Sequence, residues 1–161
     1  MKISNVLVTL SVLAALPFTA AAQVSPFVSA QVDDAARPCL DLAGASAGLP
    51  EAQAKAVATA ALGPCYDALR ALDAFEKANS GGLSAKELNY LYYVGGNVIF
   101  ITAGSEVMKN NGQLNAAICN QVIAAESAWG NVKVPLGSQI DVQMRTNTLR
   151  AMLLPSCQRA Q

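Results

Sequence analysis

An apolar run at residues 88–103, placed directly after a helix-start signal, constrains the fold more than any other feature of this sequence. The signal is Ser84-Ala-Lys-Glu87, which matches the capping box: the serine side chain accepts a hydrogen bond from the glutamate N–H, and the glutamate reaches back to the serine N–H. The run is shorter than the roughly 20 residues of a membrane span. Because it is apolar on nearly every side, we expect a helix from Ser84 that other helices surround in the core.

Five other segments carry helical periodicity or helix-boundary residues. They are residues 33–45, 51–62, 64–78, 114–129 and 138–154. We expect Gly63-Pro64 to break or sharply kink the chain, Gly104 to bend or end the central helix, and Pro155 to end the last helix. We also expect a clear break at Asn110-Asn111-Gly112. No segment of useful length alternates with a period of two. The sequence therefore predicts an all-α fold of five or six helices, packed as antiparallel hairpins joined by short turns.

The N-terminal segment is typical of a bacterial-type export signal. A lysine precedes an apolar run at residues 6–18, and Ala20 and Ala22 stand like an A-x-A cleavage site. An anchor helix is disfavoured, because polar residues and a proline interrupt the run and it is shorter than a span. We expect residues 1–22 to be removed as a signal peptide, residues 23–161 to form a single helical domain, and the protein to be periplasmic or secreted.

The four cysteines of the chain are Cys39, Cys65, Cys119 and Cys157. An even number in an exported protein indicates disulfides, and four cysteines allow three pairings. We favour Cys39 with Cys65 and Cys119 with Cys157, because each pair then brackets one predicted helical hairpin. A metal site is disfavoured, since the chain has no C-x-x-C pair and no histidine.

Charge and composition narrow the classes of function. Lys plus Arg and Asp plus Glu number 11 each, and removing Lys2 with the signal peptide leaves ten against eleven, a net charge of −1. Neither nucleic acid nor an anionic membrane surface is therefore an expected partner. The absence of histidine removes the Ser-His and Cys-His nucleophile pairs and the commonest general base. We expect no catalysis and no cofactor.

The central helix carries the candidate binding residues. Tyr90, Tyr93 and Asn97 fall at i, i+3 and i+7, so two phenols and an amide share one face. Tyrosine is enriched where proteins contact partners, and we predict that these three residues face one. The alternative is that they fill the core and bond backbone carbonyls at its edge. A neighbouring face of the helix holds a second set: Tyr92, Gly96, Ile99 and Ala103.

Two adjacent glycines, Gly95 and Gly96, lie in the middle of this helix. Each costs about 1 kcal/mol relative to alanine in a helix, so some benefit must offset them. We favour the close approach of a neighbouring helix, with the alanine-rich residues 51–62 as the candidate. The alternative is that the glycines leave room for a ligand over a groove.

Small-residue patterns within residues 64–129 resemble tetratricopeptide-repeat hairpins. Gly112-x-Leu114-x-x-Ala117-Ile118, with Ala124 farther on, resembles the turn and second helix of such a repeat, and Ala71-Leu72-x-x-Phe75-x-x-Ala78 is similar to the same helix of an earlier unit. Tyr92-Tyr93-Val94-Gly95-Gly96-Asn97 resembles the first helix. Ala71 and Ala117 stand 46 positions apart, whereas the repeat length is about 34. The resemblance implies that Tyr93 and Asn97 face a bound peptide.

Together these features predict an exported, non-catalytic helical module that binds a protein or peptide, or acts as a scaffold, through Tyr90, Tyr93 and Asn97. The alternative is a disulfide-braced carrier of a small apolar, lipid-like ligand, because glycines in the central helix leave volume for a cavity.

Overall fold

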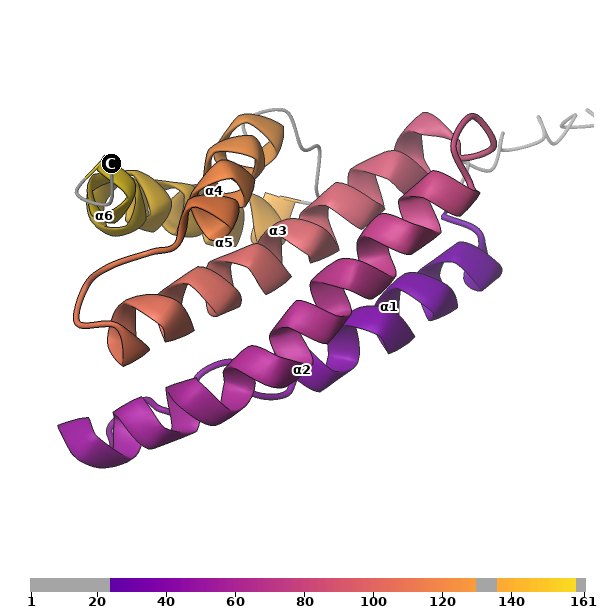
Figure 1. The fold of residues 1–161 in the computed structure, drawn as a ribbon. Coiled ribbons are helices and arrows are strands. Elements are labelled where there is room, and N and C mark those ends of the chain that lie inside the picture. The colour runs from indigo at the N-terminus through magenta and orange to yellow at the C-terminus, as the bar shows by residue number, and fades with distance from the viewer. Residues whose placement is uncertain (1–23, 130–135, 159–161) are drawn as a thin grey trace, which may run out of the picture.

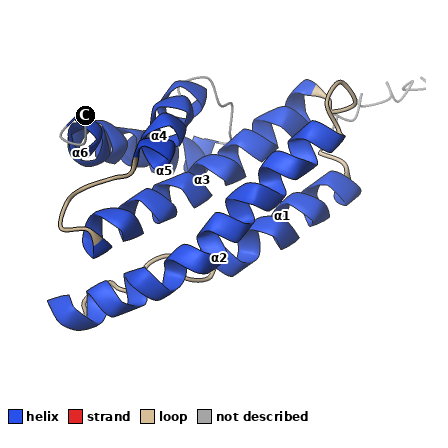
Figure 2. Cartoon of the chain, in the orientation of Figure 1, coloured by secondary structure: helices blue, strands red, loops and turns tan. Residues whose placement is uncertain are grey.

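A computed structural model describes residues 24–129 and 136–158 of the chain, which form helices and turns without a strand (Figures 1 and 2). The helices are α1 (Pro26–Leu40), α2 (Glu51–Ala78), α3 (Ala85–Lys109), α4 (Ala116–Trp129), α5 (Leu136–Thr148), a π-helical turn η1 (Leu149–Leu153) and α6 (Leu154–Gln158). The predicted all-α fold is confirmed. No described helix is both long and apolar enough to cross a membrane. The predicted signal peptide, residues 1–22, lies outside the described residues.

Helices α1, α2 and α3 form an antiparallel unit in which each helix packs against the other two (Figure 1). Their shared interior is the first core. Its fully buried members are Val32, Ala36, Cys39, Cys65 and Val98. Because all three helices contribute to this interior, α1–α3 bury their core residues against one another.

Helices α4, α5 and α6 lie on the other side of α3 (Figure 1). The second core fills the space between them and α3. Its most deeply buried members are Ala103, Ile118, Val122, Trp129 and Leu149. Helix α3 thus supplies residues to both cores, and the predicted central position of the capped apolar helix is confirmed.

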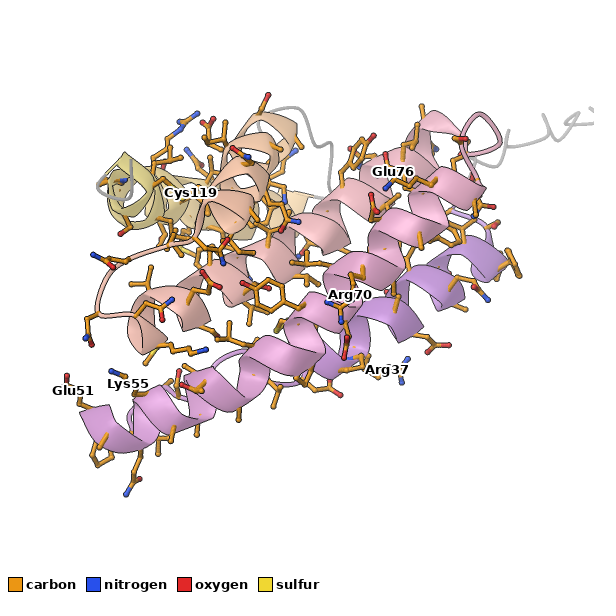
Figure 3. All side chains as sticks on the ribbon, in the orientation of Figure 1. Arg37, Glu51, Lys55, Arg70, Glu76 and Cys119 are labelled. Atoms are coloured by element: carbon orange, nitrogen blue, oxygen red, sulfur yellow. A yellow bond between two sulfur atoms is a disulfide. The ribbon has the colours of Figure 1, made fainter. Side chains whose placement is uncertain are left out.

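Both expected disulfides are present. Cys39–Cys65 joins α1 to α2 inside the first core, with Cα atoms 4.5 Å apart. Cys119–Cys157 joins α4 to α6, with Cα atoms 5.5 Å apart, and Figure 3 shows Cys119 where α4 faces α6. Each disulfide braces one half of the molecule, and neither links the two halves.

The capping box that starts α3 is also confirmed. The Glu87 N–H donates to Ser84 Oγ at 3.3 Å, and the Ser84 N–H donates to Glu87 Oε2 at 2.8 Å. These bonds satisfy two backbone donors that the first turn of a helix would otherwise leave unpaired.

The expected break at Gly63-Pro64 is wrong, because α2 runs without interruption from Glu51 to Ala78. A proline inside a helix removes a hydrogen bond and costs about 3 kcal/mol. Buried side chains lie on both sides of Pro64, with Leu62 before it and Cys65 directly after it. Packing of α2 against α1 and α3, together with the disulfide at Cys65, offsets the cost of the proline.

Two other helix boundaries differ from expectation. Helix α1 begins at Pro26, earlier than the predicted residue 33, because Ser25 Oγ accepts a hydrogen bond from the Val28 N–H at 3.2 Å. Gly104 does not end α3, which continues to Lys109. The predicted break at residues 110–112 is confirmed, because the chain turns at Asn111 and Gly112, whose φ angles are 53° and 90°.

Pro155 lies in the first turn of α6 and does not end the last helix. The π-helical turn directly precedes it, and there the Leu154 N–H bonds the Leu149 carbonyl five residues back. Proline has no N–H to donate, which is tolerated in the first turn of a helix. The shift to a hydrogen bond that spans five residues therefore lets the helical chain continue through Pro155.

Candidate functional site

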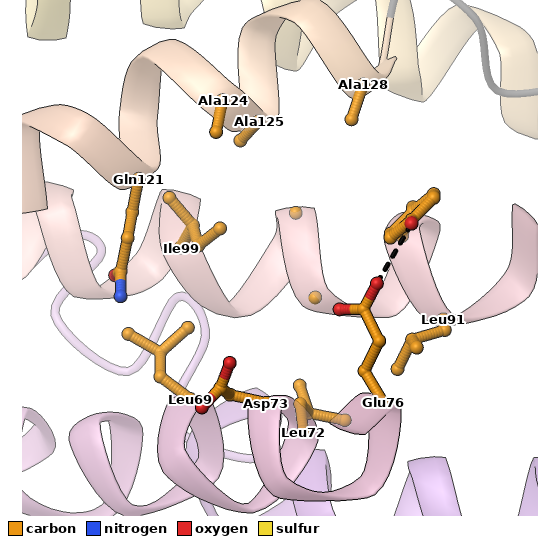
Figure 4. Close-up of a pocket in the computed structure, with 13 residues that line it drawn as sticks. Leu69, Leu72, Asp73, Glu76, Leu91, Ile99, Gln121, Ala124, Ala125 and Ala128 are labelled. Atoms are coloured by element: carbon orange, nitrogen blue, oxygen red, sulfur yellow. Dashed lines mark hydrogen bonds between the residues drawn. The ribbon is translucent and has the colours of Figure 1, made fainter. Parts of the chain in front are cut away.

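An apolar groove lies where α2 and α4 both pack against α3. It encloses about 350 Å³ and is open on one side. Helix α3 forms its floor, and α2 and α4 form its walls (Figure 4). Most of its lining side chains are aliphatic, among them Leu69, Leu72, Leu91, Ile99, Ala124 and Ala128. The short alanine side chains on α4 keep the groove wide.

Gly96 and Trp129 determine how α4 sits on α3. A Cβ atom on Gly96 would lie only 1.9 Å from Nε1 of the Trp129 indole, so only glycine allows this contact. Trp129 is 2% exposed, and its ring centroid lies 6.3 Å from that of Phe100. The expected close approach of a helix is confirmed at Gly96, but the neighbour is α4 and not residues 51–62. Gly95 lines the groove, and a Cβ atom there would meet no other atom within 4 Å.

Two carboxylates from α2, Asp73 and Glu76, reach into the groove and form its acidic rim (Figure 4). Glu76 Oε1 accepts a hydrogen bond from the Tyr92 phenol at 2.9 Å, and Asp73 Oδ2 pairs with Lys77 Nζ at 2.7 Å. The hydrogen bond to Glu76, and then burial, raise the pKa of Tyr92 above its ordinary value. Among the described residues no lysine or arginine lines the groove, so it is apolar with a negative rim.

Gln121 of α4 supplies a further acceptor at the groove wall. Its Oε1 atom is buried and has no hydrogen-bond partner among the described residues. A buried amide oxygen without a partner costs free energy, so a donor from a bound molecule would be favourable there. Gln121 lies at one end of the lined surface and Glu76 near the other (Figure 4).

The sequence-predicted residues Tyr90, Tyr93 and Asn97 lie on a different face of α3 and do not line the groove. The half-buried Tyr90 donates to Asp33 Oδ1 at 2.5 Å, and burial and this contact raise its pKa to about 12. Tyr93 is half-buried and packs against both cores. Asn97 is 8% exposed; its Nδ2 donates to the Tyr93 carbonyl at 3.0 Å, and its Oδ1 has no partner in the described part of the chain. Their role in binding stays a prediction.

The groove meets the neighbouring face of α3, which carries the second set of residues noted in the sequence. Tyr92, Gly96 and Ile99 line it together with Gly95. Their spacing is visible in the sequence as i, i+4 and i+7. Periodicity shows that these residues share a face, but it does not show which of two adjacent faces meets a groove. That choice depends on where α2 and α4 pack.

A polar cluster fixes the start of α4. Glu106 is 5% exposed and accepts hydrogen bonds from the Tyr66 phenol, from the Asn115 N–H at 3.2 Å and from Asn115 Nδ2 at 2.6 Å. Asn115 Oδ1 in turn accepts from the Ile118 N–H at 2.9 Å and caps the helix. Burial and then Glu106 raise the pKa of Tyr66 to about 12. The cluster joins α2, α3 and α4 beyond one end of the groove.

Residues 24–129 and 136–158 hold no group of three or more Cys, Asp or Glu side chains placed to bind a metal ion. No family model matches the chain, and no curated protein or solved structure matches it significantly.

Proposed function

We propose that this protein is an exported, non-catalytic binding module whose groove takes up a helical segment of a partner protein. The observation that carries the proposal is the apolar groove over α3. It separates α2 from α4, which both flank α3 there without packing closely on each other. An amphipathic helix that lays its apolar face into a hydrophobic groove is a common mode of peptide recognition.

The surrounding frame supports such a role. Disulfides are typical of exported proteins, and here one disulfide braces each half of the molecule on either side of the groove. A rigid groove loses little conformational freedom when a partner binds, so more of the contact energy appears as affinity. The alanines of α4, which include Ala124 and Ala128, let the backbone of a bound helix approach closely.

A carrier of a small apolar ligand is the second candidate. The groove volume of about 350 Å³ falls within the range of roughly 300–1,000 Å³ that is typical of ligand pockets. The open side of the groove favours a helical segment, since a carrier would shield more of its ligand from water.

Site-specific photo-crosslinking in the native exported fraction tests the proposal. A photoreactive phenylalanine analogue at Ala128, which lines the groove, is expected to capture a partner protein. The matched control is the same analogue at Ala117, which is exposed on α4 outside the groove. Equal capture at both positions, or no capture together with an apolar small molecule extracted from the purified protein, would contradict the proposal.

A further inference from the structure

We infer that the groove selects a segment with a basic residue beside its apolar face. This inference deepens the proposed function and rests on it. Asp73 and Glu76 are one helical turn apart on α2 and both reach into the groove from its rim (Figure 4). No cationic side chain of the described residues lines the groove, so its charge is complementary to a lysine or arginine on the occupant.

Glu76 is the stronger of the two contacts for a cation. Its Oε1 accepts a hydrogen bond from the Tyr92 phenol, and the residue as a whole is half-buried at the groove wall, whereas Asp73 is mostly exposed. A neutral apolar segment seated there would strip water from the carboxylate without replacing it. A lysine or arginine would replace that water with a charge-assisted hydrogen bond.

Asp73 supplies the second acceptor. Its present partner is Lys77 on the same helix, and both side chains are mostly exposed, at 60% and 75% respectively. Exposed pairs of this kind are weak, so an incoming cation competes readily for the Asp73 carboxylate. Another exposed pair on this helix, Asp67 with Arg70, lies outside the lining residues and leaves the groove charge unchanged.

The test uses synthetic helical peptides of about 15 residues with one leucine and alanine face. Three versions carry Lys, Gln or Glu at a single flanking position. The chain has one tryptophan, Trp129, which contacts the groove-lining Gly96, so its fluorescence reports occupancy, with titration calorimetry as a second readout. We expect the Lys peptide to bind about ten-fold more tightly than the Gln peptide, and the Glu peptide more weakly still.

Substitutions that remove the rim charges test whether the acidic rim causes the preference for the Lys peptide. Asp73→Asn with Glu76→Gln is expected to remove the preference for Lys, while the control Asp67→Asn keeps it; circular dichroism checks that each variant is folded. Equal binding of the Lys and Gln peptides to the wild-type protein overturns the inference and leaves the groove proposal standing. If no peptide binds, the proposed function itself fails. Binding of dodecylammonium alone, with the same dependence on the rim, would show that the occupant is a small cationic amphiphile and that the peptide proposal is wrong.

Discussion

The two halves of the molecule, α1–α3 and α4–α6, each contain one disulfide but differ in how they are held together. In the first half the helices have 15, 28 and 25 residues, and each contacts the other two. In the second half α4 has 14 residues, α5 has 13 and α6 only 5, and the main support of α4 is its contact with α3. The first half is therefore a closed unit, whereas the second depends on the surface of α3.

The contacts that hold the second half on α3 are specific. Trp129 packs against Gly96, and Asn115 donates a hydrogen bond to Glu106. The guanidinium of Arg145 lies 5.6 Å from the centre of the Phe100 ring. The same arrangement leaves α2 and α4 apart and so creates the groove. Because the second half is attached mainly through α3, an open groove remains between α2 and α4.

The largest expected effect comes from removing one disulfide at a time. Chain entropy alone predicts a loss of about 3.5 kcal/mol for Cys39–Cys65 and about 4 kcal/mol for Cys119–Cys157, since their sequence separations are 26 and 38. Because the two entropic costs are nearly equal, packing should decide which helices lose protection when each disulfide is removed. Hydrogen exchange should show that the Cys119→Ala, Cys157→Ala variant loses protection mainly in α4–α6. Equal loss of protection in α1 and α4 would mean that the halves are not distinct.

A smaller effect is expected from Gly96→Ala, because the new methyl group would overlap the Trp129 indole. Overpacking of this kind costs about 1–3 kcal/mol, and the displaced tryptophan should weaken the attachment of α4. The matched control is Gly95→Ala, whose Cβ meets nothing within 4 Å and which should gain up to about 1 kcal/mol in helix propensity. Denaturant unfolding measures both changes, and a shift of the same sign for the two variants would argue against the Gly96–Trp129 contact.

Both the first half and the junction between the halves should lose stability at alkaline pH. Tyr90 bonds Asp33 within the first half, whereas Tyr66 bonds Glu106 where the halves meet, and both phenols have pKa values raised to about 12. Above pH 10 the unfolded phenols lose protons while the folded ones keep them, so stability should fall as the pH rises from about 10 to about 12. Thermal melts across this range should show a shallower fall for Tyr66→Phe and for Tyr90→Phe. An unchanged slope in both variants would exclude these two phenols as the cause.

The smallest effect should follow from Ser84→Ala, which removes the cap at the start of α3. The expected loss is about 1 kcal/mol. Because α3 packs in both cores, hydrogen exchange should detect a similar decrease in protection in the two halves, unlike the loss of the Cys119–Cys157 disulfide. A decrease confined to the first half would show that the shared helix does not couple the halves.

Features set by residues close in sequence were predictable. The capping box at Ser84 needs only a serine and a glutamate three residues apart, and the turn at Asn111-Gly112 needs only residues that tolerate positive φ. The cysteine pairing was favoured among three possible pairings, because each pair brackets one predicted hairpin, and the structure contains this pairing. The continuity of α2 through Pro64 did not follow, since it depends on packing against α1 and α3 that no local pattern contains.

The sequence alone determined that this chain is helical, which of its helices is central, and which cysteine pairing to favour. Only the tertiary structure decided which face of α3 meets the groove, and that Trp129 is the reason Gly96 is a glycine. Helix periodicity and capping depend on residues three or four apart, so the sequence contains them directly. The groove depends on the positions of α2 and α4 around α3, which are set by contacts between residues far apart in the chain.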